Sequence, residues 1–336
     1  MKSHDLLRLF YDLGLYAYLV ATILLAVRFF WRRRWLLIAG LSVLGLGLAM
    51  QIAHMAVSWG VAGRPPFANT FETLVLLAAC LVAFFLPMTR NKDWRGVAPL
   101  VAFAALMITV YANLIMPDEF KPLLPSLLNS YWLTVHVVIC IVSYAAFVMA
   151  YISALGYLAR KPKHAKGAAL AFALSITGTV AASVFLIVGR AGGWGGRRLS
   201  ALAVAFGAAL VSALGLWPLT GIVDRRLGLR ERLPDKEALA RMTYKSVSLG
   251  FPFLTAGIIT GSIWAHQVFG HYWVWDPKET ASLVTCLVFA LYLHLRLVPK
   301  WRGPWIAWVA VAGFWCVLFT FFGVNLIGGY HAFYAS

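Results

Sequence analysis

The residues best suited to binding a ligand lie in one short stretch, "FGHYWVWDPKET", which runs from Phe269 to Thr280. Aromatic side chains and a histidine crowd its first half, and an aspartate and a proline follow. A single tryptophan at a membrane helix end usually belongs to an interfacial belt. Several together favour a flat apolar platform for a large planar ligand. The aromatic residues in and beside this stretch are Trp264, Phe269, Tyr272, Trp273 and Trp275.

Charged residues are expected at the edge of this platform. In an extended segment alternate side chains point to the same face, so Trp273 and Trp275 are expected to share one face. Lys278 follows them closely, and Arg64 lies in a loop that we predict to be on the same side of the membrane. Both residues are suited to pairing with carboxylates of a ligand, Arg64 in bidentate fashion.

The composition around this stretch is that of a membrane protein. The chain has 336 residues, of which 62% are hydrophobic and 12% charged, and its mean hydropathy is +0.80. A soluble domain is about half apolar. The net charge of +17 could suggest nucleic acid. The basic residues instead fall in segments between apolar runs, where cytoplasmic loops carry them, so we expect no nucleic-acid partner.

We predict an all-α polytopic membrane protein of about ten transmembrane helices, because apolar runs long enough to cross a bilayer recur along the chain. Lys and Arg concentrate in alternate connecting segments, which the positive-inside rule places in the cytoplasm. Both termini, residues 64–70 and the loop at 268–278 are then on the outer side. The predicted spans are residues 10–30, 35–57, 71–88, 97–115, 131–158, 167–189, 200–222, 246–267, 279–298 and 304–327.

Two stretches have the pattern of a helix start. In "DPKET", Asp276 suits the N-cap, Pro277 the first helical position, and Glu279 the third position of a capping box. The segment Asn69–Glu72, "NTFE", has the same spacing. We therefore expect helices to begin at both places.

Four histidines are candidate iron ligands. His136, near the outer start of a span, and His331, just beyond the last span, are predicted on the same side as the aromatic platform, and two neutral imidazoles can bind haem iron axially. His54 and His294 lie within predicted spans. Each is either an iron ligand or a neutral histidine that is hydrogen-bonded to a neighbouring helix. Their predicted depths differ by roughly 10 Å at the helical rise per residue. One iron would therefore need a shifted boundary or a ligand from a partner.

Two further patterns limit the chemistry. "GIITG", Gly257–Gly261, is a small-xxx-small step that lets another helix pack closely. The cysteines are isolated within apolar runs and form neither a CxxC nor a CxxCH motif, so we expect no thiol-redox site and no covalent haem of the chain's own. They are Cys80, Cys140, Cys286 and Cys316.

The stretch Trp264–Thr280, "WAHQVFGHYWVWDPKET", resembles the WWD signature of haem-handling proteins of cytochrome c maturation. With "YLHLR" after it, it is most similar to the CcsA/ResC branch (also called CcsB in some genomes) of system II. "HVVICIVSYAAF" from His136 and "GVNLIGGYHAF" up to Phe333 are similar to the segments with the two external histidines. "GRPPFANTFET" also resembles a family segment, with Arg64 where histidine is usual. Phe269 and Ala281 stand where the family usually has tryptophan.

The resemblance implies a cytochrome c haem lyase or synthase of the bacterial cytoplasmic membrane, with its active site on the outer face. Haem b would be held under the loop 264–280 between His136 and His331, where its vinyl groups meet the thiols of an apocytochrome c CxxCH motif. Trp273, Trp275 and Asp276 would form the platform. His294, with His54 or a residue of a ResB/CcsB-type membrane partner, would bind haem within the membrane.

The predicted organisation is a single transmembrane domain over residues 1–336, within which residues 160–245 form an extra helical hairpin and a basic cytoplasmic loop of unknown role. Three other functions stay open. A haem carrier or exporter would lack synthase activity. A cytochrome b-type electron-transfer subunit would need two intramembrane histidine pairs on facing helices. A transporter of an unrelated solute would leave the outer histidines unexplained.

Overall fold

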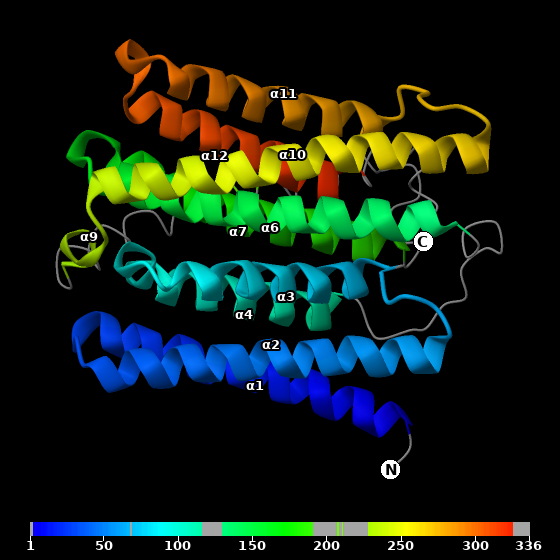
Figure 1. Ribbon diagram of the computed structural model, residues 1–336, viewed down its shortest axis with the longest axis horizontal. Coiled ribbons are helices and arrows are strands. Elements are labelled where there is room, and N and C mark those ends of the chain that lie inside the picture. The colour runs from blue at the N-terminus through cyan, green and yellow to red at the C-terminus, as the bar shows by residue number, and fades with distance from the viewer. Residues whose placement is uncertain are drawn as a thin grey trace. The chain divides into compact units, whose positions relative to one another are not determined.

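The computed structural model describes residues 3–67, 69–115, 130–190, Gly207, Leu210 and 228–324, and every secondary-structure element in this part is helical (Figure 1). The all-α fold class is therefore confirmed. The long helices are α1 (Ser3–Phe30), α2 (Arg34–Ala62), α3 (Thr70–Met88), α4 (Ala98–Ile115), α6 (Tyr131–Ala159), α7 (Pro162–Arg190), α10 (Lys236–Phe269), α11 (Pro277–Leu297) and α12 (Pro304–Leu318). The short elements are η1 (Lys92–Gly96), α9 (Leu229–Arg232), η2 (Pro299–Trp301) and the π turn η3 (Phe319–Gly323).

Seven helices in the described residues are long and apolar enough to cross a membrane, which confirms a polytopic membrane protein. They are α1, α2, α3, α6, α10, α11, and α12 with η3. The predicted spans 97–115 and 167–189 fall on α4 and α7. The predicted span 200–222 lies outside the described residues, apart from Gly207 and Leu210. The side of the membrane that each end faces stays a prediction.

Helix α10 begins ten residues before the predicted span at 246–267. Its 34 residues correspond to about 51 Å at the rise of an α-helix, more than the ~30 Å of a bilayer's hydrocarbon core. The prediction that residues 224–245 form one connecting segment is wrong from Lys236 onward. The sequence after Pro234, "DKEALARMTYK", is rich in strong helix formers, and it allows the apolar helix to continue into water.

The contacts among helices divide the chain into two compact units. The first comprises Met1–Met149 and Leu249–Trp273, and the second comprises Ala150–Ser248 and Val274–Ser336. The division falls within helices α6 and α10 and within the loop between α10 and α11, residues 270–276, which we call the aromatic loop. The single domain over residues 1–336 and the role of residues 160–245 stay predictions, and much of 160–245 lies outside the described residues.

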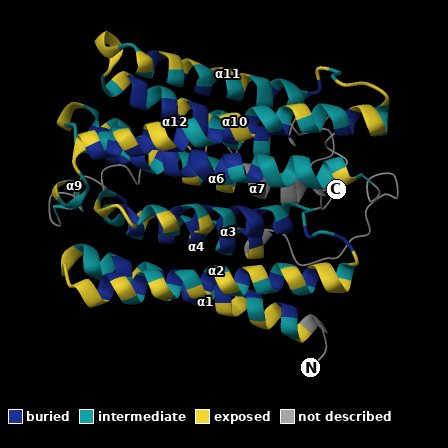
Figure 2. Ribbon diagram, viewed as in Figure 1, coloured by how far each residue is buried: buried dark blue, intermediate teal, exposed yellow. Residues whose placement is uncertain are grey.

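A buried polar network ties three helices of the first unit together. Helix α1 packs on α2 and α4, and α3 packs on the same two helices. Tyr18 Oη donates to Gln51 Oε1 at 2.8 Å, and Gln51 Nε2 donates to Thr109 Oγ1 at 3.0 Å. Tyr11 Oη donates to the Thr109 carbonyl at 2.6 Å. These residues are buried, whereas α1 and α2 carry many exposed apolar side chains on their other faces (Figure 2).

In the second unit an aromatic and hydroxyl cluster joins α6, α7 and α12. The ring of Tyr151 stacks on Phe314, with the centroids 4.3 Å apart. Tyr151 Oη and Ser175 Oγ lie 2.6 Å apart, and Trp315 Nε1 donates to the same Ser175 oxygen at 2.9 Å. Helix α11 packs on α12. The two helices that follow the aromatic loop therefore belong to one packed body.

We predict that Gln51→Leu lowers the free energy of unfolding by about 1–3 kcal/mol, because the buried hydroxyl groups of Tyr18 and Thr109 each lose their bond to Gln51. The measurement is thermal unfolding of the purified full chain in one detergent. The matched control is Gln267→Leu, since Gln267 is exposed and accepts one bond from Ser130. Equal shifts in Tm for the two variants would contradict a stabilising role of the network.

Candidate functional site

The aromatic loop starts at a clear helix end. Gly270 has a positive φ of 79°, and its amide donates to the His266 carbonyl at 2.9 Å, which closes α10 in the way typical of glycine. Two contacts then hold the loop against α10. Ser262 Oγ donates to the Tyr272 carbonyl at 2.8 Å, and the ring of His266 stacks on that of Tyr272 with centroids 4.1 Å apart and planes at 9°.

The other end of the loop is fixed by the capping box predicted from "DPKET". Asp276 is the N-cap of α11 and accepts from the Lys278 amide at 2.9 Å, with Pro277 at the helix start. Glu279 Oε2 accepts from the Asp276 amide at 3.2 Å. The predicted cap at "NTFE" is confirmed as well, because Asn69 Oδ1 accepts from the Glu72 amide at 2.7 Å at the start of α3.

The carboxylate of Glu279 also fixes the backbone of Trp275. Glu279 Oε2 accepts from the Val274 amide at 2.9 Å as well as from the Asp276 amide, so it binds the amides on both sides of Trp275. Trp275 has a φ of 58°, in the left-handed region that bulky residues rarely adopt. The expectation of an extended segment is therefore wrong at Trp275. Converging amides around one oxygen form an anion-binding nest, which favours this conformation.

The predicted platform residues differ in how far their side chains are exposed. Trp275 and Tyr272 have exposed fractions of 69% and 57%. Trp264 is 2% exposed and packs edge-on against Phe269, with ring centroids 5.7 Å apart, so it belongs to the core at the end of α10. Trp273 is half-buried. Trp275 and Tyr272 are therefore accessible to a ligand, and Trp264 is not.

His136 lies in a groove made by two glycines of α10. Its Nδ1 lies 2.7 Å from the Gly257 carbonyl oxygen, which only accepts, so Nδ1 carries the proton. A Cβ at Gly261 would lie 2.7 Å from the His136 ring, and one at Gly257 would lie 2.5 Å from Cys140 Sγ. The sequence predicted close packing at "GIITG", and the structure shows that His136 and Cys140 of α6 fill the step. The neutral Nδ1–H tautomer has its lone pair on Nε2, the form in which histidine binds a metal.

The other predicted iron ligands are placed differently. His54 is 4% exposed, its Nδ1 lies 3.0 Å from the Leu7 carbonyl, and its ring contacts Tyr11 and Phe71 edge-on. His294 is exposed and lies 17 residues after Pro277, about 26 Å along α11. His331 lies outside the described residues. His54 and His136 belong to the first unit and His294 to the second, so their roles as ligands stay predictions.

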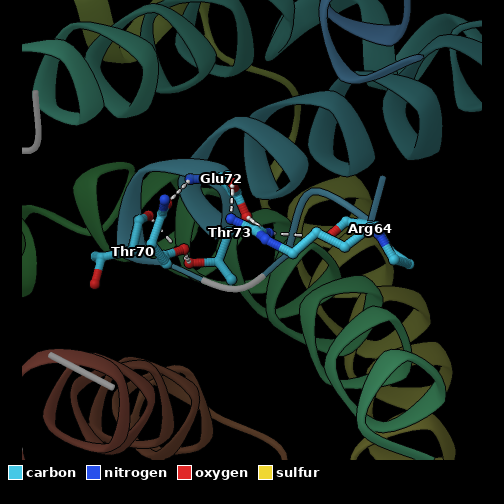
Figure 3. Close-up of polar contacts among 6 residues, drawn as sticks. Arg64, Thr70, Glu72 and Thr73 are labelled. Atoms are coloured by element: carbon cyan, nitrogen blue, oxygen red, sulfur yellow. Dashed lines mark hydrogen bonds and ion pairs between the residues drawn. The ribbon is translucent and has the colours of Figure 1, made fainter. Parts of the chain in front are cut away.

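Arg64 forms a bidentate ion pair that the sequence did not indicate. Its Nη1 and Nη2 lie 3.0 Å and 3.1 Å from Glu72 Oε2 and Oε1 (Figure 3), and Nη1 also donates to the Pro65 carbonyl at 3.2 Å. Both side chains are less than 10% exposed. The fork that we predicted for a ligand carboxylate thus holds a carboxylate of the chain itself. Lys278 is partly exposed, and the pairing of either cation with a ligand stays a prediction.

A model of the family described as "Cytochrome C assembly protein" matches residues 67–331, which include the aromatic loop, His136 and His331. The chain belongs to the cytochrome c assembly protein family. Proteins named "Cytochrome c biogenesis protein CcsA" from Synechococcus elongatus and Synechocystis sp. are 33% and 34% identical to it over 308 and 305 residues. These matches cover 88% and 87% of this chain and 86% and 88% of the relatives. A protein of the same name from Chlorella vulgaris is 32% identical over 298 residues, 88% of this chain and 85% of the relative. The resemblance to the CcsA branch is confirmed.

We predict that Glu279→Ala frees the backbone around Trp275 and speeds hydrogen exchange of the Val274 and Asp276 amides by about tenfold or more, because each loses its acceptor. The measurement is the rate of hydrogen exchange in peptides that cover residues 270–280, detected by mass spectrometry. Glu237→Ala is the matched control, because Glu237 is exposed and pairs with neighbouring Lys236. Unchanged exchange in Glu279→Ala would show that the carboxylate does not fix the loop.

We also predict that Gly257→Ala and Gly261→Ala each lower the Tm by several degrees, because a Cβ at either position overlaps Cys140 or His136. Thermal unfolding of the detergent-purified chain measures this shift. Gly60→Ala in α2 is the matched control, since a Cβ there meets nothing within 4 Å. If all three variants unfold at the wild-type temperature, α6 and α10 do not need this close approach.

Proposed function

We propose that the chain is the membrane subunit of a system II cytochrome c synthase. Its role is in cytochrome c maturation, as its family and its CcsA-named relatives indicate. In the finer proposal, the chain moves or receives haem b and presents it on the outer face of the bacterial cytoplasmic membrane. A ResB/CcsB-type membrane partner and an apocytochrome c with a CxxCH motif complete the reaction.

The observation that carries the proposal is the setting of His136. Here the Gly257 carbonyl selects the Nδ1–H form and orients the ring, and a metal-binding histidine commonly has such a bond to a backbone carbonyl. His136 would bind one axial position of the haem iron through Nε2, and His331 the other.

The aromatic loop supports the same role. Trp275 is held with its indole exposed, although an apolar ring of that size usually finds cover. The nest formed around Glu279 fixes the backbone that carries it. A rigid exposed indole loses little entropy when a flat ligand stacks on it. Trp275, Tyr272 and Trp273 would support the apolar face of haem, while Asp276 fixes the helix start beside them.

The proposed reaction needs positioning more than activated groups. The thiol of each CxxCH cysteine adds across a haem vinyl group: its sulfur bonds to one vinyl carbon, and its hydrogen goes to the other. Atoms and electrons balance without an oxidant or a leaving group. Holding both reactants in a reactive geometry replaces a bimolecular encounter with an intramolecular one. The chain's residues therefore need to fix the ring and leave its vinyl edge accessible.

Within the membrane we propose His294 as one ligand of a second haem site. His54 or a residue of the partner is the candidate for the other ligand. His54 has the same tautomer as His136, because the Leu7 carbonyl accepts from its Nδ1. Haem could then pass between sites without release into water.

The experiment compares absorption spectra of wild type, His136→Ala and His331→Ala, each purified from membranes with the presumed partner. A pyridine haemochrome assay identifies the haem type. We predict non-covalent b-type haem in the wild type and a loss of most of that haem in each variant. Added imidazole should restore the spectrum of His136→Ala, which would not occur if His136 only supported the fold.

His164→Ala is the control, because His164 accepts a bond from Trp308 in the second unit and is not a proposed ligand. An unchanged haem spectrum in His136→Ala would contradict the proposed axial ligation. Co-expression with a CxxCH apocytochrome separates a synthase from a haem carrier. Covalent cytochrome c supports the synthase, and bound haem without a covalent product supports the carrier.

A further inference from the structure

A basic pocket in the second unit has no part in the function proposed above. It has a volume of about 420 Å³ and is lined by residues from the ends of α6, α10, α11 and α12. Among its lining residues, five cations face one carboxylate, that of Glu237, which leaves four net positive charges. The cations are Lys161, Lys236, Arg241, Arg296 and Arg302.

The helix ends assemble this charge. Helix α6 ends just before Lys161, and α10 begins at Lys236, so both lysines stand at one end of the packed helices. Arg302 Nε donates to the Arg296 carbonyl at 3.3 Å, which positions the turn between α11 and α12 beside the pocket. Lys236 lies 3.8 Å from Glu237, but both side chains are more than half exposed, so this pair neutralises little of the charge.

The walls of the pocket are partly apolar and lie at the level of an aromatic belt. Tyr157, Tyr292 and Ile306 line it beside the cations. Trp301 and Trp305, each 43% exposed, lie in the adjacent turn and helix start. Exposed indoles at the ends of membrane helices mark the depth of lipid headgroups. A ligand at this depth reaches the pocket from the bilayer surface.

We propose that this pocket binds the phosphodiester headgroup of an anionic phospholipid. Basic pockets between transmembrane helices bind anionic headgroups, and the positive-inside rule places these basic helix ends at the cytoplasmic leaflet. The headgroup phosphate would contact the cations, its glycerol would fill the rest of the pocket, and its acyl chains would lie along the exposed apolar helix surfaces. None of the proposed haem ligands is among the residues that line this pocket.

The test measures phosphatidylglycerol retained by the full chain in native mass spectrometry, with phosphatidylcholine as the zwitterionic comparison. We expect Arg296→Gln/Arg302→Gln to weaken phosphatidylglycerol binding about 10- to 30-fold, since each lost cation contributes about fivefold. The charge-matched control is Lys163→Gln/Lys300→Gln, because both lysines are exposed and neither lines the pocket. The control should bind like the wild type.

A second variant, Lys161→Gln/Lys236→Gln, removes the same charge from the residues at the end of α6 and the start of α10, and it should weaken binding similarly even if the arginine variant folds poorly. Equal binding by all variants, or equal retention of phosphatidylcholine, would overturn the proposal. Displacement of the lipid by millimolar inorganic phosphate would assign the pocket to a soluble anion. If the pocket variants lost bound haem but retained phosphatidylglycerol, the pocket would be assigned to haem carboxylates. Either of these two results would reject the lipid proposal.

Discussion

A bilayer core offers no water to satisfy a polar group, so each polar group inside must find its partner within the protein. Three buried or partly buried polar side chains of the first unit follow this constraint. Gln51 joins Tyr18 and Thr109, and the rings of His54 and His136 each donate to a backbone carbonyl. The hydrogen bonds that satisfy these two histidines also select their tautomer. At His136 the bond that stabilises a partly buried imidazole also leaves the lone pair on Nε2, as the proposed iron ligation requires.

Backbone groups at the helix ends also need partners, and side chains provide some of them. The loop between α10 and α11 contains few backbone bonds of its own in the described residues. Ser262 binds its first part and Glu279 its last part. The unusual conformation of Trp275 follows from the second of these contacts. An exposed indole on a fixed backbone is a better stacking surface than one on a mobile loop, because less conformational entropy is lost on binding.

Local rules predicted the helix starts, because capping depends on residues three or four positions apart. "DPKET" and "NTFE" both cap helices as their spacing indicated. The pattern "GIITG" predicted close packing, but His136 is 121 residues distant, and only tertiary structure identifies it as the occupant. The start of α10 was missed because apolarity marks where a helix enters lipid, while the helix itself continues into water. Trp275 was missed because alternation assumes an extended chain, and a side-chain carboxylate overrides it there.

The carboxylate of Glu72 already occupies the guanidinium of Arg64, at which we predicted that a ligand carboxylate would bind. Two of the guanidinium's nitrogens already hold a carboxylate, and both partners are buried. An external carboxylate would have to displace the Glu72 carboxylate from both guanidinium nitrogens, and separating a buried ion pair is costly. A ligand that paired with Arg64 would therefore need binding energy from contacts elsewhere.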